Sequence, residues 1–128
     1  CGTGISTRFW DYSKCERIGI DPAEKLITIA QKKDIYGQYF VESAENISFE
    51  DDLFDFVISV SAIHNFDNID TALEEIKRVS NHIVIITVLK KAAAFERIIE
   101  KIKNKFGLVK EREQEMDSIL LCFKDSKV

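Results

Sequence analysis

The stretch IGIDPAEKLITIA, residues 18–30, joins a short apolar strand to an amphipathic helix through an acidic residue. The segment Arg17–Ile20 predicts the strand, which ends at Asp21. Asp21 can cap the following helix, Pro22 suits its first position, and Glu24 stands three residues after the cap. The apolar face of this helix, which extends to about Lys33, consists of Leu26, Ile27, Ile29 and Ala30.

Outward from this unit, apolar strand segments alternate with helical ones. The further strands are expected at Tyr39–Val41, Phe54–Val60, His82–Leu89, Leu108–Glu113 and Ser118–Phe123. The further helices are expected at Ser6–Lys14, around Ile69, Leu73, Ile76 and Val79, and at Ala92–Phe106. This alternation predicts an α/β fold, a Rossmann-like, doubly wound and mostly parallel sheet whose last strand is antiparallel. The run Phe54–Val60 is mostly apolar, which is typical of a strand covered on both faces.

Composition fits one soluble domain over residues 1–128 and no membrane protein. Apolar residues make up 45% of the chain, and no run approaches the roughly 20 apolar residues of a membrane-spanning helix. The three cysteines, Cys1, Cys15 and Cys122, have no metal-site spacing, so we expect no bound metal and reduced thiols in a cytoplasmic protein.

Charge is unevenly distributed along the chain, although the formal net charge of −4 argues against a generally basic nucleic-acid binder. Residues 1–75 carry 15 acidic and 6 basic side chains, and residues 76–128 carry 7 acidic and 12 basic ones. The basic half is either a solvated helix face or a surface for an anionic substrate. The same two alternatives apply to Lys90 and Lys91, which follow a strand.

Polar or glycine-rich turns follow successive strands, so the right-handed crossover rule brings them to one edge of the sheet. These turns are Cys1-Gly2-Thr3-Gly4, Asp21 and Glu42-Ser43-Ala44-Glu45. Glycines let the backbone approach a ligand, and a carboxylate can accept hydrogen bonds from both hydroxyls of a ribose. Position 7, where a dinucleotide fingerprint would place a third glycine, holds Thr7. The layout therefore favours an adenosyl ligand without phosphates.

Several segments, taken in order, resemble class I S-adenosylmethionine-dependent methyltransferases. They are CGTG at 1–4, IGIDPAEKLITIA at 18–30, SAENISFEDDLFDFVISVSAIHNF at 43–66 and ALEEIKRV at 72–79. The resemblance implies S-adenosylmethionine as cofactor. It places Gly2, Thr3 and Gly4 at the methionine and ribose portion, Asp21 and the adjoining Pro22 at the ribose, Ser43, Ala44 and Glu45 at the adenine, and the backbone near Ser59 at the methionine end.

The family's first strand has no counterpart in the sequence, which opens on the glycine-rich loop at Cys1. We therefore expect an upstream segment in the natural protein that supplies this strand.

Candidates for catalysis are few, because methyl transfer mainly requires alignment of the nucleophile with the methyl group. His64 is the one weak candidate, and packing at a helix start is the alternative role. His82 is interpreted as structural.

The methyl acceptor stays open among small molecules, RNA and protein. Nucleic acid is possible without specific support. The alternative functions are a noncatalytic S-adenosylmethionine-binding subunit of a larger complex and, less favoured, a nicotinamide-dependent oxidoreductase.

Overall fold

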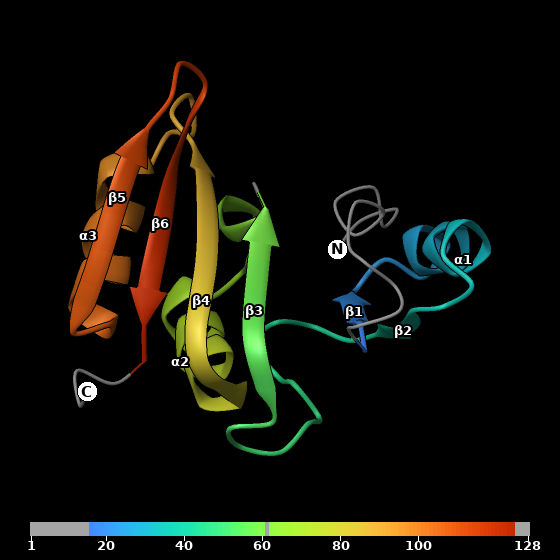
Figure 1. Cartoon of the computed structure of the whole chain (residues 1–128). Coiled ribbons are helices and arrows are strands. Elements are labelled where there is room, and N and C mark those ends of the chain that lie inside the picture. Colours follow the sequence, from blue (N-terminus) through green and yellow to red (C-terminus); the bar gives the residue numbers. More distant parts are fainter. Residues whose placement is uncertain (1–15, 61, 125–128) are drawn as a thin grey trace. The chain divides into compact units, whose positions relative to one another are not determined.

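The computed structural model describes residues 16–60 and 62–124, and it divides the chain into two compact units, Cys1–Ala44 and Glu45–Val128 (Figure 1). The glycine-rich turn and the helix expected at Ser6–Lys14 lie outside the described residues, as does the side chain of His64. Each unit is described separately below.

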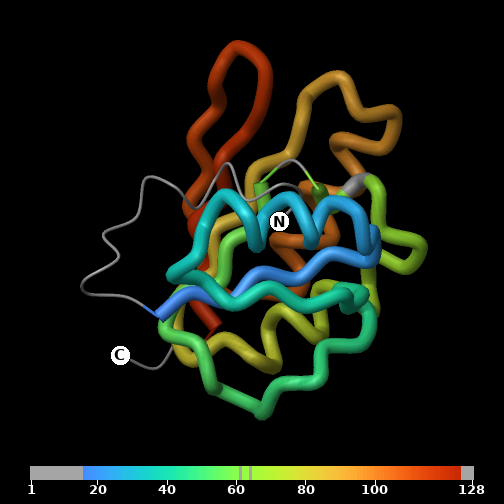
Figure 2. The backbone as a smooth tube through the Cα atoms, turned by 90° about the vertical axis from the view of Figure 1, so that its right-hand side faces the viewer, coloured from blue at the N-terminus to red at the C-terminus, as the bar shows by residue number. Residues whose placement is uncertain are grey.

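The first unit is a strand–helix–strand unit with parallel strands. Strands β1 (Ile18–Asp21) and β2 (Gln38–Val41) pair in parallel, and helix α1 (Glu24–Lys33) connects them. Figure 2 shows α1 running beside the two strands. Its buried side chains Ile27 and Ala30 pack with Tyr39 of β2 in a small apolar cluster.

The start of α1 differs from the prediction. The helix begins at Glu24 after Ala23 as N-cap, and no side chain caps it, so the assignment of Asp21 as cap and of Pro22 as first helical residue was wrong. The Asp21 carboxylate accepts a hydrogen bond from the Ala23 N–H at 2.8 Å. An aspartate that bonds the backbone two residues on closes a local turn, and this turn delays the helix by two residues.

A buried ionic cluster lies at the opposite end of β2. Asp34, at the C-terminal end of α1, is 4% exposed and pairs with the buried Arg17 guanidinium. The Tyr39 hydroxyl donates to the same carboxylate at 2.5 Å, and the Tyr36 and Gly37 N–H groups donate at 3.2 Å. A Cβ at position 37 would lie 2.6 Å from the Asp34 carboxylate and 2.8 Å from the Tyr39 ring, so this approach requires glycine.

The second unit contains a four-stranded mixed sheet in the order β3-β4-β6-β5. Its strands are β3 (Phe54–Val60), β4 (Ser80–Leu89), β5 (Leu108–Glu113) and β6 (Asp117–Phe123). β3 and β4 pair in parallel, whereas β6 is antiparallel to both β4 and β5. The predicted α/β class, the parallel pairing and the antiparallel last strand are therefore confirmed.

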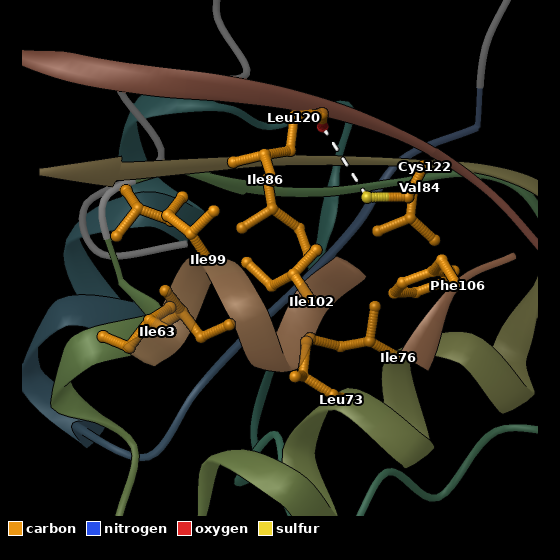
Figure 3. Close-up of a cluster of buried hydrophobic side chains, with 12 residues drawn as sticks. Ile63, Leu73, Ile76, Val84, Ile86, Ile99, Ile102, Phe106, Leu120 and Cys122 are labelled. Atoms are coloured by element: carbon orange, nitrogen blue, oxygen red, sulfur yellow. Dashed lines mark hydrogen bonds between the residues drawn. The ribbon is translucent and has the colours of Figure 1, made fainter. Parts of the chain in front are cut away.

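Helices α2 (Ile69–Val79) and α3 (Phe95–Lys105) cover one face of this sheet (Figure 1). Both helices were expected, although α3 begins three residues later than predicted. Between sheet and helices lies the main core, in which side chains from α2, α3, β4 and β6 meet (Figure 3). Its fully buried members include Leu73, Val84, Ile86, Ile102 and Leu120.

Strand β3 is less covered than its apolar sequence predicts. Val57 packs against the core, but Phe56, Ile58 and Val60 are 55%, 38% and 47% exposed. Within the described residues, β3 is an edge strand of the four-stranded sheet, and the helices α2 and α3 cover only the face to which Val57 points. An apolar run shows that a strand can be buried on both faces, but it does not show the position of the strand in the sheet.

The core of the second unit includes a cysteine. Cys122 is fully buried in β6, and its thiol is free. Burial raises the pKa of this thiol to about 12 because the thiolate would lose its hydration. Cys122 is therefore a small apolar core residue, not a nucleophile.

No helix within residues 16–60 and 62–124 has the length and apolarity needed to cross a membrane.

The ionic cluster predicts acid-sensitive stability. Burial raises the pKa of Asp34, but the hydrogen bonds from Tyr39 and Arg17 outweigh it and hold the pKa below the ordinary value of 3.8. Asp34 therefore stabilises the fold above about pH 4, and this contribution is lost as pH falls through the lowered pKa. Asp34→Asn should cost about 3–5 kcal/mol at pH 7, because it breaks a buried ion pair.

Urea unfolding of the parent and the variant between pH 3 and pH 7 measures both effects. The difference between the two proteins should shrink as the pH is lowered. The exposed Asp67 provides a matched control, Asp67→Asn, which should change stability by less than about 0.5 kcal/mol. A constant difference between parent and Asp34→Asn at every pH would contradict the assignment.

Candidate functional site

Asp21 and the turn after β2 lie side by side at the C-terminal edge of the first unit. Asp21 pairs with Val41 in the parallel register, and the Glu42 N–H donates to the Asp21 carbonyl at 3.2 Å. The Asp21 side chain is half-buried at the end of its strand. Parallel pairing therefore brings together two of the three predicted turns.

Ser43 and Ala44 continue directly from this edge and are half-buried. Glu45, the third residue assigned to the adenine, belongs to the second unit. Its carboxylate accepts a hydrogen bond from the Asn68 N–H at 3.2 Å, at the N-cap of α2. One side chain of the turn predicted to bind the adenine therefore already has a structural contact within the second unit.

Ser59 stands next to the last residue of β3, at the corresponding C-terminal edge of the second unit. It pairs with Ile86 in β4 and is 9% exposed. Its hydroxyl oxygen has no hydrogen-bond partner within the part of the chain that the structure describes. Burying a hydroxyl without a partner is costly, so such a group often has a role beyond packing.

The remaining candidates are not placed in a site. Gly2, Thr3 and Gly4 lie outside the described residues, and Pro22 is exposed in the turn before α1. His64 lies in the short 3-10 helix η2 (Ile63–Asn65), and nothing is described of its side chain. His82 is exposed and its ring meets Phe123 edge to face at 5.8 Å, which is a structural contact. The described residues contain no group of three side chains that could hold a metal ion.

Most lysines of the basic half that follow α2 are engaged in ion pairs. Lys101 and Lys105 of α3 pair with Asp70 and Glu74 of α2 at 2.7 and 3.1 Å. Three more pairs join Lys90 to Glu113, Lys103 to Glu111 and Lys124 to Asp52. These contacts favour a helix face with paired charges over a surface for an anionic substrate.

The sequence interpretation missed Arg78, the most connected side chain near these turns. It donates to backbone carbonyls of the loop between Glu45 and β3, at Ile47 and Phe49, both at 2.8 Å. In the sequence it is one more cation near the end of an amphipathic helix. These two carbonyls lie about thirty residues earlier and are backbone atoms, so no side-chain pattern reveals them.

The strand-end edge of the first unit supplies a carboxylate, Asp21, beside the polar turn that follows β2. A carboxylate can accept hydrogen bonds from two neighbouring hydroxyls, and a polar turn can read the edge of a purine. These groups suit a nucleoside ligand with little negative charge.

Comparisons with known proteins identify the family of this chain. The sequence profile of the family described as a methyltransferase domain matches residues 1–86, more than half of the chain. A comparison with curated protein sequences gives no significant match.

Solved structures share the fold at low sequence identity. The PH0226 protein of Pyrococcus horikoshii superposes with a TM-score of 0.81 and 19% identity, over 96% of this chain and 77% of that one. The TehB-like SAM-dependent methyltransferase of Corynebacterium glutamicum gives 0.75 and 17%, over 96% and 75%. A complex of the Haloferax volcanii Trm112 methyltransferase activator with a methyltransferase gives 0.69 and 12%, over 85% and 72%.

The family match confirms the resemblance seen in the motifs and gives no support to a nicotinamide-dependent oxidoreductase. The chain belongs to the methyltransferase-domain family, and it is an S-adenosylmethionine-dependent methyltransferase.

Proposed function

We propose that residues 1–128 form one methyltransferase domain that holds S-adenosylmethionine through the turns at its strand ends. The observation that carries this proposal is the pairing of Asp21 with the turn after β2 in the first unit. Asp21 would bind the ribose hydroxyls, with Pro22 beside it, and Ser43, Ala44 and Glu45 would bind the adenine. Ser59 in the second unit would meet the methionine end, and Gly2, Thr3 and Gly4 would line the methionine and ribose portion.

When bound, S-adenosylmethionine supplies a methyl group on a sulfonium. The protein's own task is to hold and orient. The Asp21 carboxylate keeps its position because the Ala23 N–H donates to it at 2.8 Å. The buried Ser59 hydroxyl has an unused donor and acceptor within the described residues. Neither group needs to gain or lose a proton, since alignment contributes most of the rate in a displacement of this kind.

The proposal also covers the methyl acceptor and a partner subunit, each given only as a class of molecule. The acceptor is a small molecule, an RNA or a protein, and a proton-accepting role for His64 depends on which of them it is. A partner subunit is part of the proposal because one structural neighbour was solved with an activator subunit. A cytoplasmic location is proposed on the cysteine usage, since Cys122 is a free thiol in the core.

Ligand preference tests the proposed function directly. The natural full-length protein should bind S-adenosylmethionine and S-adenosylhomocysteine and should not bind NAD, because the turns described here suit an adenosyl group without phosphates. Isothermal titration with the three ligands measures this. Tight NAD binding without any response to S-adenosylhomocysteine would refute the proposal.

Asp21→Ser separates the ribose contact from the local turn. Serine can still accept the Ala23 N–H bond but cannot hold two hydroxyls as a carboxylate does. A charge-assisted hydrogen bond contributes about 1.5–3 kcal/mol, so affinity for S-adenosylhomocysteine should fall about ten- to a hundredfold. The melting temperature without ligand should stay close to that of the parent.

Asp21→Ala provides the comparison, because it removes both the turn contact and the ribose contact. It should lose the same affinity and in addition about 1 kcal/mol of stability. If Asp21→Ser binds S-adenosylhomocysteine as tightly as the parent, Asp21 only closes the turn.

Ser59→Ala should leave the ligand-free protein as stable as the parent or more stable, because the substitution removes a buried hydroxyl without a partner. The matched control is Ser118→Ala, whose fully buried hydroxyl donates to Glu111 at 2.8 Å. That control should lose about 1 kcal/mol. Thermal melts and titration with S-adenosylhomocysteine distinguish the two serines, and only Ser59→Ala should weaken binding. A clear loss of stability in Ser59→Ala would show that its hydroxyl is a structural group.

A further inference from the structure

We propose that Arg78 is a positioning residue that fixes the loop behind the adenine turn, so that the turn is ordered before the cofactor binds. The inference rests on the proposed function, because it takes Ser43–Glu45 as the adenine turn. Arg78 lies in the last turn of α2, and within the described residues its side chain donates hydrogen bonds to Glu75 and to the loop before β3.

The guanidinium of Arg78 donates hydrogen bonds to three acceptors on alternate residues of the loop. Its Nη2 donates to the Ile47 carbonyl, and its Nη1 donates to the Phe49 carbonyl and to the Asp51 carboxylate, each at 2.8 Å. Its Nε donates to Glu75 on the same helix at 2.8 Å, which orients the group. The hydrogen bonds that Arg78 donates to the Asp51 and Glu75 carboxylates raise the pKa of Arg78, so its charge is permanent.

The backbone of Arg78 holds the end of the same loop. Its carbonyl accepts hydrogen bonds from the Asp52 N–H at 2.9 Å and from the Lys124 ammonium at 3.2 Å. Asp52 has a left-handed backbone, with φ of 58°, which is unfavourable for a residue other than glycine. Lys124 also pairs with the Asp52 carboxylate, so the unfavourable conformation is held from two sides.

The other end of the loop is fastened at the start of α2, where Glu45 accepts from the Asn68 N–H. Helix α2 has 11 residues and is about 16 Å long. The loop of residues 45–52 is therefore attached at both ends of one rigid helix. It contains no helix or strand of its own, so its carbonyls depend on donors such as Arg78.

Order in this loop matters for binding because a mobile turn must be immobilised when the ligand arrives, and that cost lowers affinity. A planar guanidinium with several N–H donors can serve two carbonyls and a carboxylate together, whereas a lysine ammonium is a single point. Arg78→Lys should therefore keep the positive charge but lose the simultaneous hydrogen bonds to Ile47, Phe49 and Asp51.

The test compares Arg78→Lys with Glu75→Gln in the full-length protein. Glu75→Gln removes the charge of the partner within α2, but the glutamine side-chain carbonyl can still accept the bond from Arg78 Nε, so the guanidinium stays oriented and keeps its bonds to Ile47 and Phe49. Arg78→Lys should accelerate hydrogen exchange of the backbone amides of residues 45–53 and raise the Kd for S-adenosylhomocysteine about tenfold. Glu75→Gln should leave both within about twofold of the parent. Lys124→Met removes only the contacts at the Asp52 end of the loop. It should also accelerate hydrogen exchange and raise the Kd for S-adenosylhomocysteine, but by less than Arg78→Lys does. This variant replaces Arg78→Lys in the test if Arg78→Lys does not fold.

Two results would overturn the inference. Unchanged exchange in the loop would show that Arg78 does not order it. Faster hydrogen exchange in the loop with an unchanged Kd for S-adenosylhomocysteine would show that the order of the loop does not affect cofactor binding. If Arg78 is only a structural residue, Arg78→Lys should give this result together with a lower melting temperature. If the parent protein does not bind S-adenosylhomocysteine, the proposed function is refuted, and so is the role of Arg78 in cofactor binding. The hydrogen-exchange data would then still show whether Arg78 orders the loop.

Discussion

Parallel strands must be joined by a connection that returns across the sheet, and each unit of this chain is built around one such pair. In the first unit α1 returns the chain from β1 to β2, and in the second α2 returns it from β3 to β4. The crossover places the turns that follow the strands at one edge of each pair. Asp21, the turn after β2 and Ser59 owe their positions to this constraint, whatever their side chains do.

Features that depend on local periodicity could be predicted from the sequence. The apolar run of β4, the spacing of Ile69, Leu73, Ile76 and Val79, and the terminal hairpin all appear where their patterns place them. In each case the buried face can be recognised within a single stretch of sequence, because an element that packs against a neighbouring layer needs one apolar stripe at the spacing of its own helix or strand. The position of Asp21 at a strand end followed from the same kind of pattern.

Features that depend on distant partners could not be predicted. The exposure of Phe56 on β3 arises because α2 and α3 cover only the opposite face of the sheet, and the sequence of β3 does not record which faces are covered. The delayed start of α1 arises because Asp21 bonds to Ala23, a competition that propensity alone does not decide. Arg78 resembles an ordinary helical cation, and its meaning lies in carbonyls about thirty residues away. The lack of a hydrogen-bond partner for the Ser59 hydroxyl within the described residues can be recognised only when the positions of all its neighbours are known.

The contact of Lys124 with Asp52 and with the Arg78 carbonyl has a consequence for biosynthesis. These partners are separated by 72 and 46 residues in the chain. During translation the loop before β3 emerges long before β6, which carries the lysine into place. Lys124 must therefore leave the ribosome before this loop acquires these contacts, so a nascent chain that ends before Lys124 holds the loop only through the other contacts of Arg78 and Glu45.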